Sequence, residues 1–272
     1  MYCPAIVVRE VIGVVPPFLD LAGHPLRWRM LVELAGSDRQ VGELTRTLGE
    51  PQGLVSYHLA RLRDGGLVSS HKSSFDGRSV YYRVHLDRCG ELLAATGAAL
   101  HPGLRSGGPR ASACPLARGR NQRHRVKVLF ACTGNGTRSQ LAEALLRDKA
   151  GDTVEVVSAG SHPKPIHSNT INVLAEMGID IAGARSKSIA EFSGHPFDYV
   201  ITLCDKVREV CPKFPGRGRT MHWSIEDPSL ASGTARATLP AFRAVAADLE
   251  SRIGFLISLI DQQTTKEHAR HG

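Results

Sequence analysis

The sequence predicts two domains of different fold class. The first is a small α+β domain of helices followed by a β-hairpin, and the second is a three-layer α/β domain around a four-stranded parallel sheet. Three observations support this organisation. The chain has 272 residues, more than one domain usually holds. Its first hundred residues show helical and then hairpin patterns, whereas the residues after 126 alternate between buried strands and amphipathic helices.

A basic segment separates the two halves. Residues 101–127 carry seven Lys/Arg and no Asp/Glu, within a chain whose net charge is +8. They are also rich in Gly, Pro, Ser and Ala, which is typical of a flexible linker. The charge either solvates a tether or adds attraction to DNA phosphates, which would make DNA binding salt-sensitive. The expected boundaries are a first domain at 1–100, a linker at 101–125, a second domain at 126–263 and a disordered tail at 264–272.

The composition excludes some classes of protein. No run of eighteen apolar residues is present, so no transmembrane helix is expected. The first residues have no basic region and no small-residue cleavage site, which argues against a secretion signal. The six scattered cysteines do not resemble a secreted disulfide framework, so a cytoplasmic location with redox or metalloid chemistry is expected.

The first domain begins with three predicted helices. Residues 24–36 and 40–49 each end at a glycine, and residues 52–68 follow after a brief turn. The last two form a helix-turn-helix pattern, in which the second helix would enter the major groove of DNA. The residues expected to point inward are Leu26, Met30, Leu31, Leu34, Leu54, Leu59 and Leu62.

A hairpin is predicted next, because two extended runs flank Asp76-Gly77. With the helices it would make a winged helix. The stretches LVSYHLARLRDGGLV and DGRSVYYRV resemble the ArsR-type repressors, which are dimeric winged-helix regulators, over roughly residues 15–100. The resemblance implies binding to operator DNA and a homodimer formed through this domain. The expected DNA contacts are Gln52, Ser56, Tyr57, His58 and Arg61 on the helix and Lys72 and Arg78 in the wing. The alternative is a helical domain with a hairpin and no role in DNA binding.

The family's usual sensing site is missing. Many ArsR-type members bind a metal or metalloid through a Cys-x-Cys pair on the second of these helices, and here that stretch, GELTRTLG, has no cysteine. Trivalent arsenic prefers three thiolates. Cys3, Cys89 and Cys114 could supply them, within one chain or across a dimer. The alternative is that Cys89 is a core thiol and the other two are incidental.

The second domain alternates strands and helices. Strands are expected at 126–131, 154–160, 198–203 and 220–225, and helices at 139–151, 168–178 and about 239–260. This order predicts a parallel sheet covered on both faces, with its chemistry at the carboxyl ends of the strands. Cys132, Cys204 and Asp227 all fall at those ends.

The stretch CTGNGTRSQ is a Cys-x5-Arg loop between a buried strand and a helix. Five intervening residues let backbone N–H groups surround one oxyanion, and the helix behind adds the positive end of its dipole. Arg138 would clamp two oxygens of a tetrahedral anion, and the same groups would stabilise a Cys132 thiolate as a nucleophile. Ser139 could donate to that thiolate, and Asn135 is expected to brace the loop. The loop residues expected to surround the anion are Thr133, Gly134, Asn135, Gly136, Thr137 and Ser139.

From about residue 126 to 259 the chain resembles the low-molecular-weight tyrosine phosphatase fold, and more closely its arsenate reductase branch. The motifs are CTGNGTRSQLAEALL, SAG, TLCDKVREVCP, HWSIEDP and FRAVAADLESRIGFL. A phosphatase would use Cys132 as nucleophile, Arg138 as anion clamp and Asp227 as general acid. Phosphatases of this fold commonly carry an aromatic residue after the Asp-Pro pair, which here is followed by Ser229. They also have no need of Cys204 and Cys211.

For the reductase branch, the resemblance implies a relay. Cys132 attacks arsenic, Cys204 attacks Cys132 and releases arsenite, and Cys211 carries the disulfide to thioredoxin. Two helical turns between Cys204 and Cys211 span about 10 Å, too far for a disulfide, so the segment must loop out. A mycothiol- or glutaredoxin-type thiol as reductant would make Cys211 dispensable. The alternative is that Cys204 and Cys211 are simply buried or metal-binding thiols.

Three further residues are expected to support the loop: Glu143, Ser158 and Lys187. Some related reductases hold a potassium ion with an Asp where this chain has Lys187, so the resemblance implies that the ammonium replaces the ion and contacts Asn135 or Glu143. No tightly bound cofactor is expected, and no histidine pair has the context of a metal site in this half.

The sequence therefore predicts an arsenic-responsive regulator fused to an arsenate reductase, with arsenate, arsenite, operator DNA and thioredoxin as partners and no membrane. One alternative is a tyrosine phosphatase fused to the regulator. Another is a regulator whose second half only senses arsenate or redox state.

Overall fold

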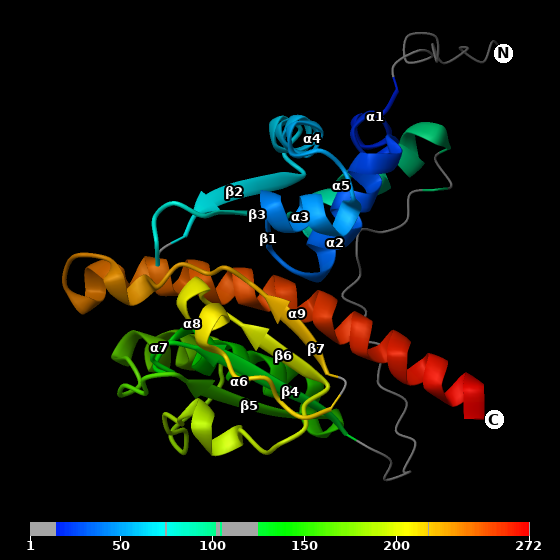
Figure 1. The fold of residues 1–272 in the computed structure, drawn as a ribbon. Coiled ribbons are helices and arrows are strands. Elements are labelled where there is room, and N and C mark those ends of the chain that lie inside the picture. Colours follow the sequence, from blue (N-terminus) through cyan, green and yellow to red (C-terminus); the bar gives the residue numbers. More distant parts are fainter. Residues whose placement is uncertain (1–14, 74, 102–103, 105–124, 217, 272) are drawn as a thin grey trace, which may run out of the picture. The chain divides into compact units, whose positions relative to one another are not determined.

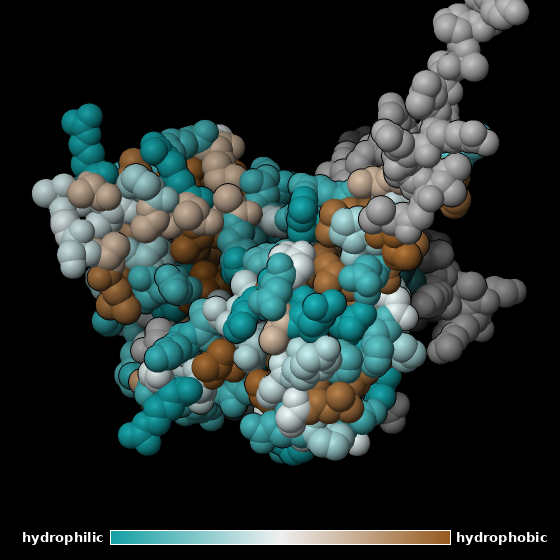
Figure 2. Space-filling model, turned by 90° about the horizontal axis from the view of Figure 1, so that it is seen from above, coloured by the Kyte–Doolittle hydropathy of each residue, from teal (hydrophilic) through white to brown (hydrophobic). Residues whose placement is uncertain are grey.

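The computed structural model describes residues 15–73, 75–101, 104, 125–216 and 218–271, with side chains described up to residue 263. The chain divides into two compact units, the first mostly of residues before 101 and the second mostly of residues after 124, with residues 36–39 and 71–81 grouped with the second (Figure 1). Among the described residues, no helix combines the length and the apolar character needed to cross a membrane. The face shown in Figure 2 is largely hydrophilic, and its hydrophobic residues form small separate groups among the hydrophilic ones.

The N-terminal region consists of short helices and a small sheet whose strand order is β1-β3-β2. Its described elements are α1 (Pro17–Ala22), α2 (Pro25–Gly36), β1 (Arg39–Gln40), α3 (Val41–Leu48), α4 (Gln52–Asp64), β2 (Val68–Lys72), β3 (Val80–Val84) and α5 (Leu86–Leu100). The predicted turn lies between β2 and β3. Asp76 Oδ1 accepts hydrogen bonds from the N–H groups of Arg78 and Ser79, both at 2.9 Å, and Gly77 has a left-handed φ of 64°. The hairpin prediction is confirmed.

The core of this region is formed by the apolar faces of α2, α3 and α4. Its buried residues include Leu26, Met30, Leu31, Leu34, Leu44, Leu48, Val55, Leu59 and Leu62. The prediction was wrong for Leu54, which is 41% exposed, while Val55 is fully buried. Residues 55, 59 and 62 follow the i, i+4, i+7 spacing of one helical face, which leaves residue 54 outside it.

The second unit is an α/β domain. Its elements in the described chain are β4 (Val126–Cys132), α6 (Arg138–Ala150), η2 (Gly151–Thr153), β5 (Val154–Gly160), α7 (Ser168–Glu176), η3 (Ile189–Phe192), β6 (Tyr199–Thr202), α8 (Asp205–Val210), β7 (Arg219–His222), η4 (Pro228–Leu230) and α9 (Ala235–His271). The sheet order is β5-β4-β6-β7, and each neighbouring pair is parallel (Figure 1).

Both faces of this sheet are covered. Alternate residues of β4 point to opposite faces, as strand geometry requires. Val128 and Phe130 belong to the larger core, which includes the buried side chains of α6 and α9. Leu129 belongs to a smaller core with Phe197 and Val200. The predicted fold class, a winged helix-turn-helix followed by an α/β domain with a four-stranded parallel sheet, is therefore confirmed.

The register of the strands brings their carboxyl ends to one edge. Cys132 pairs with Gly160 across β4 and β5, and Thr202 of β6 pairs with His222 of β7. The segments that follow these strands therefore emerge next to one another. This is the edge at which chemistry is expected in open α/β sheets.

Helix α9 is longer than the sequence indicated. It begins at Ala235, before the expected start near residue 239, and includes Pro240 in its early turns. It also continues through residues 264–271, for which a disordered tail was expected.

Candidate functional site

Residues 132–138 form a loop between β4 and α6 whose carbonyl oxygens are held from outside. The carbonyls of residues 132, 133, 134 and 136 accept hydrogen bonds from N–H groups between residues 161 and 167, at 2.8 to 3.2 Å. Ser186 Oγ donates to the carbonyl of Asn135 at 3.0 Å. A loop whose carbonyls face outward turns its N–H groups inward, which suits it to an oxyanion.

Close packing around the loop requires glycine at two positions. A Cβ on Gly136 would come within 2.6 Å of the Pro165 carbonyl oxygen. A Cβ on Gly160 would come within 2.8 Å of the Asn135 nitrogen and of the Thr133 carbonyl oxygen. Both distances are shorter than a real Cβ contact, so any other residue would push the loop out of shape.

Asn135 braces the loop from inside, as the sequence predicted. Its Nδ2 donates to Ser139 Oγ at 2.9 Å and to Ser158 Oγ at 2.7 Å. Its Oδ1 accepts from Gln140 Nε2 at 3.2 Å and from the Lys187 N–H at 2.7 Å. The residue is fully buried and has a φ of 44°, a conformation that asparagine tolerates better than most residues. Four hydrogen bonds therefore hold a strained backbone in place.

The Cys132 thiol lies at the base of this loop and is almost completely buried. Its Sγ is 2.9 Å from Ser139 Oγ and accepts a hydrogen bond from the Asn135 N–H at 3.2 Å. The predicted contact between Ser139 and Cys132 is confirmed.

Arg138 is buried at the start of α6 and reaches Asp227. Its Nη2 donates to Asp227 Oδ2 at 2.6 Å, and its Nη1 donates to the Ile225 carbonyl oxygen at 3.0 Å. Its Nε is buried with no partner among the described residues. A buried donor without an acceptor is costly, so this atom is available to an incoming anion.

The three predicted supporting residues form one cluster. Lys187 Nζ donates to Glu143 Oε2 at 3.0 Å, and Ser158 Oγ donates to the same oxygen. Arg147 pairs with the other oxygen of Glu143. The expected contact between Lys187 and Glu143 is confirmed. The replacement of a potassium ion by this ammonium stays a prediction.

Cys204 lies beside the loop and Cys211 lies farther along. Cys204 directly precedes α8, and its Sγ is 3.3 Å from Thr133 Oγ1. Burial raises the pKa of the Cys204 thiol, although the nearby Arg138 guanidinium opposes the change. Burial and the proximity of Cys204 raise the pKa of Cys211 to about 11. Both thiols are therefore protonated in this conformation at neutral pH.

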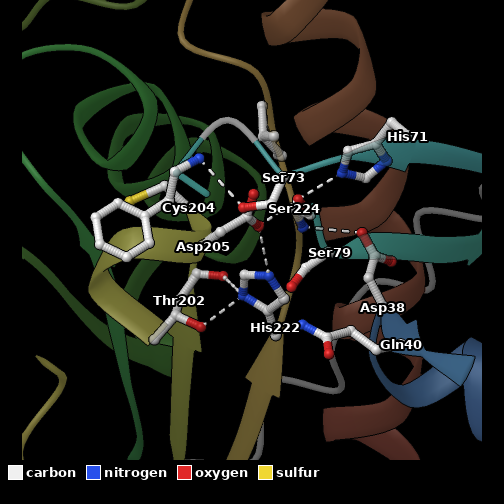
Figure 3. A network of polar contacts seen from close by, with 12 residues as sticks. Asp38, Gln40, His71, Ser73, Ser79, Thr202, Cys204, Asp205, His222 and Ser224 are labelled. Carbon is white, nitrogen blue, oxygen red and sulfur yellow. Dashed lines mark hydrogen bonds and ion pairs between the residues drawn. The ribbon is translucent and has the colours of Figure 1, made fainter. Parts of the chain in front are cut away.

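A buried polar network next to Cys204 was not predicted (Figure 3). His222 Nε2 lies 3.1 Å from Asp205 Oδ1, and its Nδ1 lies 2.8 Å from Thr202 Oγ1. Ser224 Oγ donates to the same oxygen of Asp205. Burial opposes ionisation, yet the hydrogen bonds from His222 and Ser224 lower the pKa of Asp205 to about 2. The His-x-Ser spacing of His222 and Ser224 at the end of β7 was the only sequence signal, and it is a weak one.

In the N-terminal region, most predicted DNA contacts are exposed. Those with exposed side chains are Gln52, Ser56, Tyr57, Arg61, Lys72 and Arg78. His58 is a correction. It is 5% exposed, and its ring packs at a tilt against that of His24, with centroids 4.4 Å apart. Its position on the inner face of α4 removes it from the surface that could face DNA.

Of the three cysteines proposed for arsenite, Cys89 alone lies in the described residues. It packs against the core of the helical unit from α5, and burial raises the pKa of its thiol. Cys3 and Cys114 lie outside the described residues. The three-thiol site therefore stays a prediction.

The α/β fold and the loop define the class: a protein that can hold a tetrahedral oxyanion beside a buried cysteine thiol. The family model for "Low molecular weight phosphotyrosine protein phosphatase" matches residues 127–268, more than half of the chain. The chain belongs to this family. The model for "Bacterial regulatory protein, arsR family" matches residues 24–70, so an ArsR-type helix-turn-helix precedes the phosphatase-like domain.

The similar curated proteins include arsenate reductases. That of Halalkalibacterium halodurans is 36% identical over 126 residues, which cover 46% of this chain and 91% of the relative. The arsenate reductase of Bacillus subtilis is 33% identical over 126 residues, which again cover 46% of this chain and 91% of the relative. A solved structure described as "An arsenate reductase in the phosphate binding state" has 31% identity and a TM-score of 0.42, and the match covers 50% of this chain and 98% of that one.

Proposed function

We propose that the chain joins an arsenic-responsive regulator, residues 1–100, through a basic linker, residues 101–125, to an arsenate reductase, residues 126–263. The observation that carries the reductase assignment is the Cys204 thiol 3.3 Å from Thr133 of the loop. Hydrolysis of a phosphate ester needs one nucleophilic thiol. Reduction of arsenate needs two electrons, and two thiols at the loop supply them when they are oxidised to a disulfide. The relatives named arsenate reductase support this choice.

In the first step the loop N–H groups and Arg138 hold the oxygens of arsenate, and the Cys132 thiolate attacks arsenic. A sulfur–arsenic bond forms and one hydroxyl leaves as water. Asp227, which contacts Arg138 at the anion site, is the proposed donor of the proton to that oxygen.

In the second step Cys204 attacks the sulfur of Cys132. The sulfur–arsenic bond breaks and its electron pair stays on arsenic, which leaves as arsenite. The two sulfurs are oxidised to a Cys132–Cys204 disulfide, so the electrons balance.

In the third step Cys211 attacks Cys204 and frees Cys132. Cys211 lies seven residues after Cys204 and its pKa is raised to about 11, so it is unreactive in the resting conformation. Opening of α8 would bring it into contact with Cys204 and expose it to water, which lowers the cost of its thiolate. The resulting Cys204–Cys211 disulfide would be reduced by thioredoxin, or by a mycothiol- or glutaredoxin-type thiol.

Arsenate reduction by the full chain, coupled to thioredoxin, thioredoxin reductase and NADPH, tests this function. The Cys211→Ser variant should complete one turnover and then stop, whereas the Cys89→Ser variant should turn over like the parent. No arsenite from the parent with any thiol reductant would refute the reductase. Sustained turnover by Cys211→Ser with thioredoxin would refute the role of Cys211.

A phosphatase is the second candidate, because Asp227 at 2.6 Å from Arg138 is also suitably placed to act as the general acid of phosphate ester hydrolysis. Hydrolysis of p-nitrophenyl phosphate, measured beside arsenate reduction, separates the two. A hydrolysis rate far above the reduction rate would favour the phosphatase. Absence of both activities in the parent chain would leave only a non-catalytic sensor of arsenate or redox state.

For the N-terminal region, the exposed face of α4 and the wing support operator binding, and we propose that this region binds as a homodimer. Arsenite released by the second unit would then be the signal. The test is DNA release by arsenite in Cys3→Ser, Cys89→Ser and Cys114→Ser variants. Unchanged release in all three would refute the three-thiol site.

A further inference from the structure

We propose that Asp205 and His222 are positioning residues, which fix the amino end of α8 and thereby hold Cys204 at the loop while the Cys211 end of the helix opens. This inference deepens the proposed relay. Of its two tests below, the disulfide measurement depends on the relay and the alkylation measurement does not. It assigns a role to a buried pair that the chemistry of Cys132 does not use.

Asp205 and His222 lie directly beside Cys204, at the amino end of α8. Asp205 is the first residue of α8 and directly follows Cys204, so an anchor on its carboxylate also fixes the neighbouring thiol. The carboxylate is held by His222 Nε2 at 3.1 Å and by Ser224 Oγ (Figure 3). An acidic side chain in the first helical turn also interacts favourably with the helix dipole.

The His222 side chain that holds the Asp205 carboxylate is itself fixed by the sheet. His222 is the last residue of β7 and pairs in register with Thr202, the last residue of β6. Its Nδ1 lies 2.8 Å from Thr202 Oγ1 and 3.2 Å from the Thr202 carbonyl oxygen. The imidazole is therefore fixed on one side by the sheet and on the other by α8. The pKa of about 2 for Asp205 keeps the carboxylate charged at any working pH.

The two ends of α8 are held in different ways. The helix has six residues, too few to be stable without tertiary contacts. At its far end Val210 is 57% exposed and Cys211 is only half-buried. Hydrogen bonds thus fix the end near Cys204, whereas the Cys211 end is held by apolar packing of a half-buried thiol, which can separate without leaving a buried charge unpaired.

Alkylation by iodoacetamide tests this asymmetry without any assumption about arsenate. In the full-length parent, Cys211 should react only when its end of α8 opens, and Cys204 should react more slowly still because Asp205 and His222 hold it in place, as read by peptide mass spectrometry. In Asp205→Ala and His222→Ala, labelling of Cys204 should accelerate about tenfold, because loss of a buried hydrogen bond to a charged group makes local opening around the thiol more frequent. Glu209→Ala, which removes an exposed carboxylate from the same helix, should change nothing. Equal labelling of Cys204 in parent and variants would overturn the proposal.

The second test measures the first disulfide in a Cys211→Ser background, mixed with arsenate and quenched without reductant. Formation of the Cys132–Cys204 disulfide should slow about tenfold in His222→Ala and recover in His222→Gln, whose amide can replace the imidazole donor. The rate of Cys132 labelling should stay at the parent value. The proposal is wrong if the rate of Cys132 labelling falls as much as the rate of disulfide formation. It is also wrong if the disulfide forms at the parent rate in His222→Ala.

The failures are distinguishable. If the Cys211→Ser parent forms no disulfide and releases no arsenite, the reductase proposal fails, and the labelling test still decides the anchor. If Asp205→Ala does not fold, Asp205→Asn and Ser224→Ala remove one interaction at a time, and faster Cys204 labelling is expected in both. Unchanged labelling in both would count against the anchor.

Discussion

Asn135 illustrates at the scale of one residue how the oxyanion loop is built. Its side chain bonds to Ser139, Ser158, Gln140 and the Lys187 backbone, while its own backbone has a φ of 44°. The spacing of the loop was readable in the sequence, and the bracing role of this amide was predicted. Its partners beyond the loop come from β5 and from the segment before η3, so only the fold identifies them.

Two substitutions at Asn135 separate its hydrogen bonds from its backbone strain. Asn135→Ala should destabilise the second unit by about 2–4 kcal/mol, because several buried hydrogen bonds are lost and Ala is strained at positive φ. Asn135→Gly should cost about 1 kcal/mol less, because glycine adopts this φ freely. Urea unfolding followed by Trp223 fluorescence, in a Trp28→Phe background, measures both. Equal losses would show that the φ of 44° carries no strain.

His58 is a second residue whose role depends on its burial. Burial lowers its pKa, and the neighbouring His24 and Arg27 charges lower it further. Protonation therefore costs more in the folded than in the unfolded state. The stability that follows is present above the unfolded pKa of about 6.5 and is lost as the pH falls toward the lower folded value.

The first unit should therefore be less stable at pH 5.5 than at pH 7.5, and His58→Gln should reduce this difference. Hydrogen exchange of α4 in the full chain measures the stability at both pH values. His101→Gln, at the end of α5, is the control and should keep the parent difference. An unchanged difference in His58→Gln would contradict the assignment.

At the scale of elements, α4 shows that the phase of a helix is not set by hydrophobicity alone. Leu54 is exposed, whereas Val55 and the polar His58 are buried. A leucine would be assigned to the core from its side chain, but one residue turns the helix by about 100°. Contacts with α2 and α3 select the face that carries residues 55, 59 and 62.

This phase predicts unequal costs for two identical substitutions. Leu59→Ala should destabilise the first unit by about 2–5 kcal/mol, because the side chain is fully buried and leaves a cavity. Leu54→Ala should change the stability by less than about 0.5 kcal/mol, as expected of an exposed position. Hydrogen exchange of α4 in the full chain compares them. Similar losses at both positions would show that the helix is wrongly phased.

At the scale of the whole molecule, the basic excess of the chain is confined almost entirely to one segment, residues 101–127. Residues 101–127 carry seven positive charges, while residues 128–272 carry equal numbers of acidic and basic residues. If the first unit binds DNA, the salt dependence of binding counts the phosphates that its cations neutralise.

Arg61→Ala should lower the slope of log K against log salt by about 1, because one phosphate contact is lost. Arg185→Ala, an exposed arginine of the second unit, should leave the slope unchanged. Neutralising Arg105, Arg110 and Arg118 together decides the role of the linker. A lower slope would show that it contacts phosphates, and an unchanged slope would leave it as a tether. Fluorescence anisotropy on operator DNA at several salt concentrations measures all of these.

The sequence by itself determined the features encoded in neighbouring residues. These features depend on local geometry and can therefore be predicted from the sequence. They are the glycine-terminated helices, the Asp76-Gly77 turn, the buried run of β4 and the Cys-x5-Arg spacing. The order of strands and helices also indicated that Cys132, Cys204 and Asp227 would share the carboxyl edge of the sheet.

The tertiary structure decided the features that join distant residues. Arg138 meets Asp227 across 89 positions, and Asp205 meets His222 across 17, because parallel strands bring their ends together whatever the chain length between them. The chemical type of a side chain does not determine which distant residue it contacts. The physical reason is that a buried charge or hydrogen bond is stabilised by whichever group the packing places beside it, and packing is a property of the whole fold.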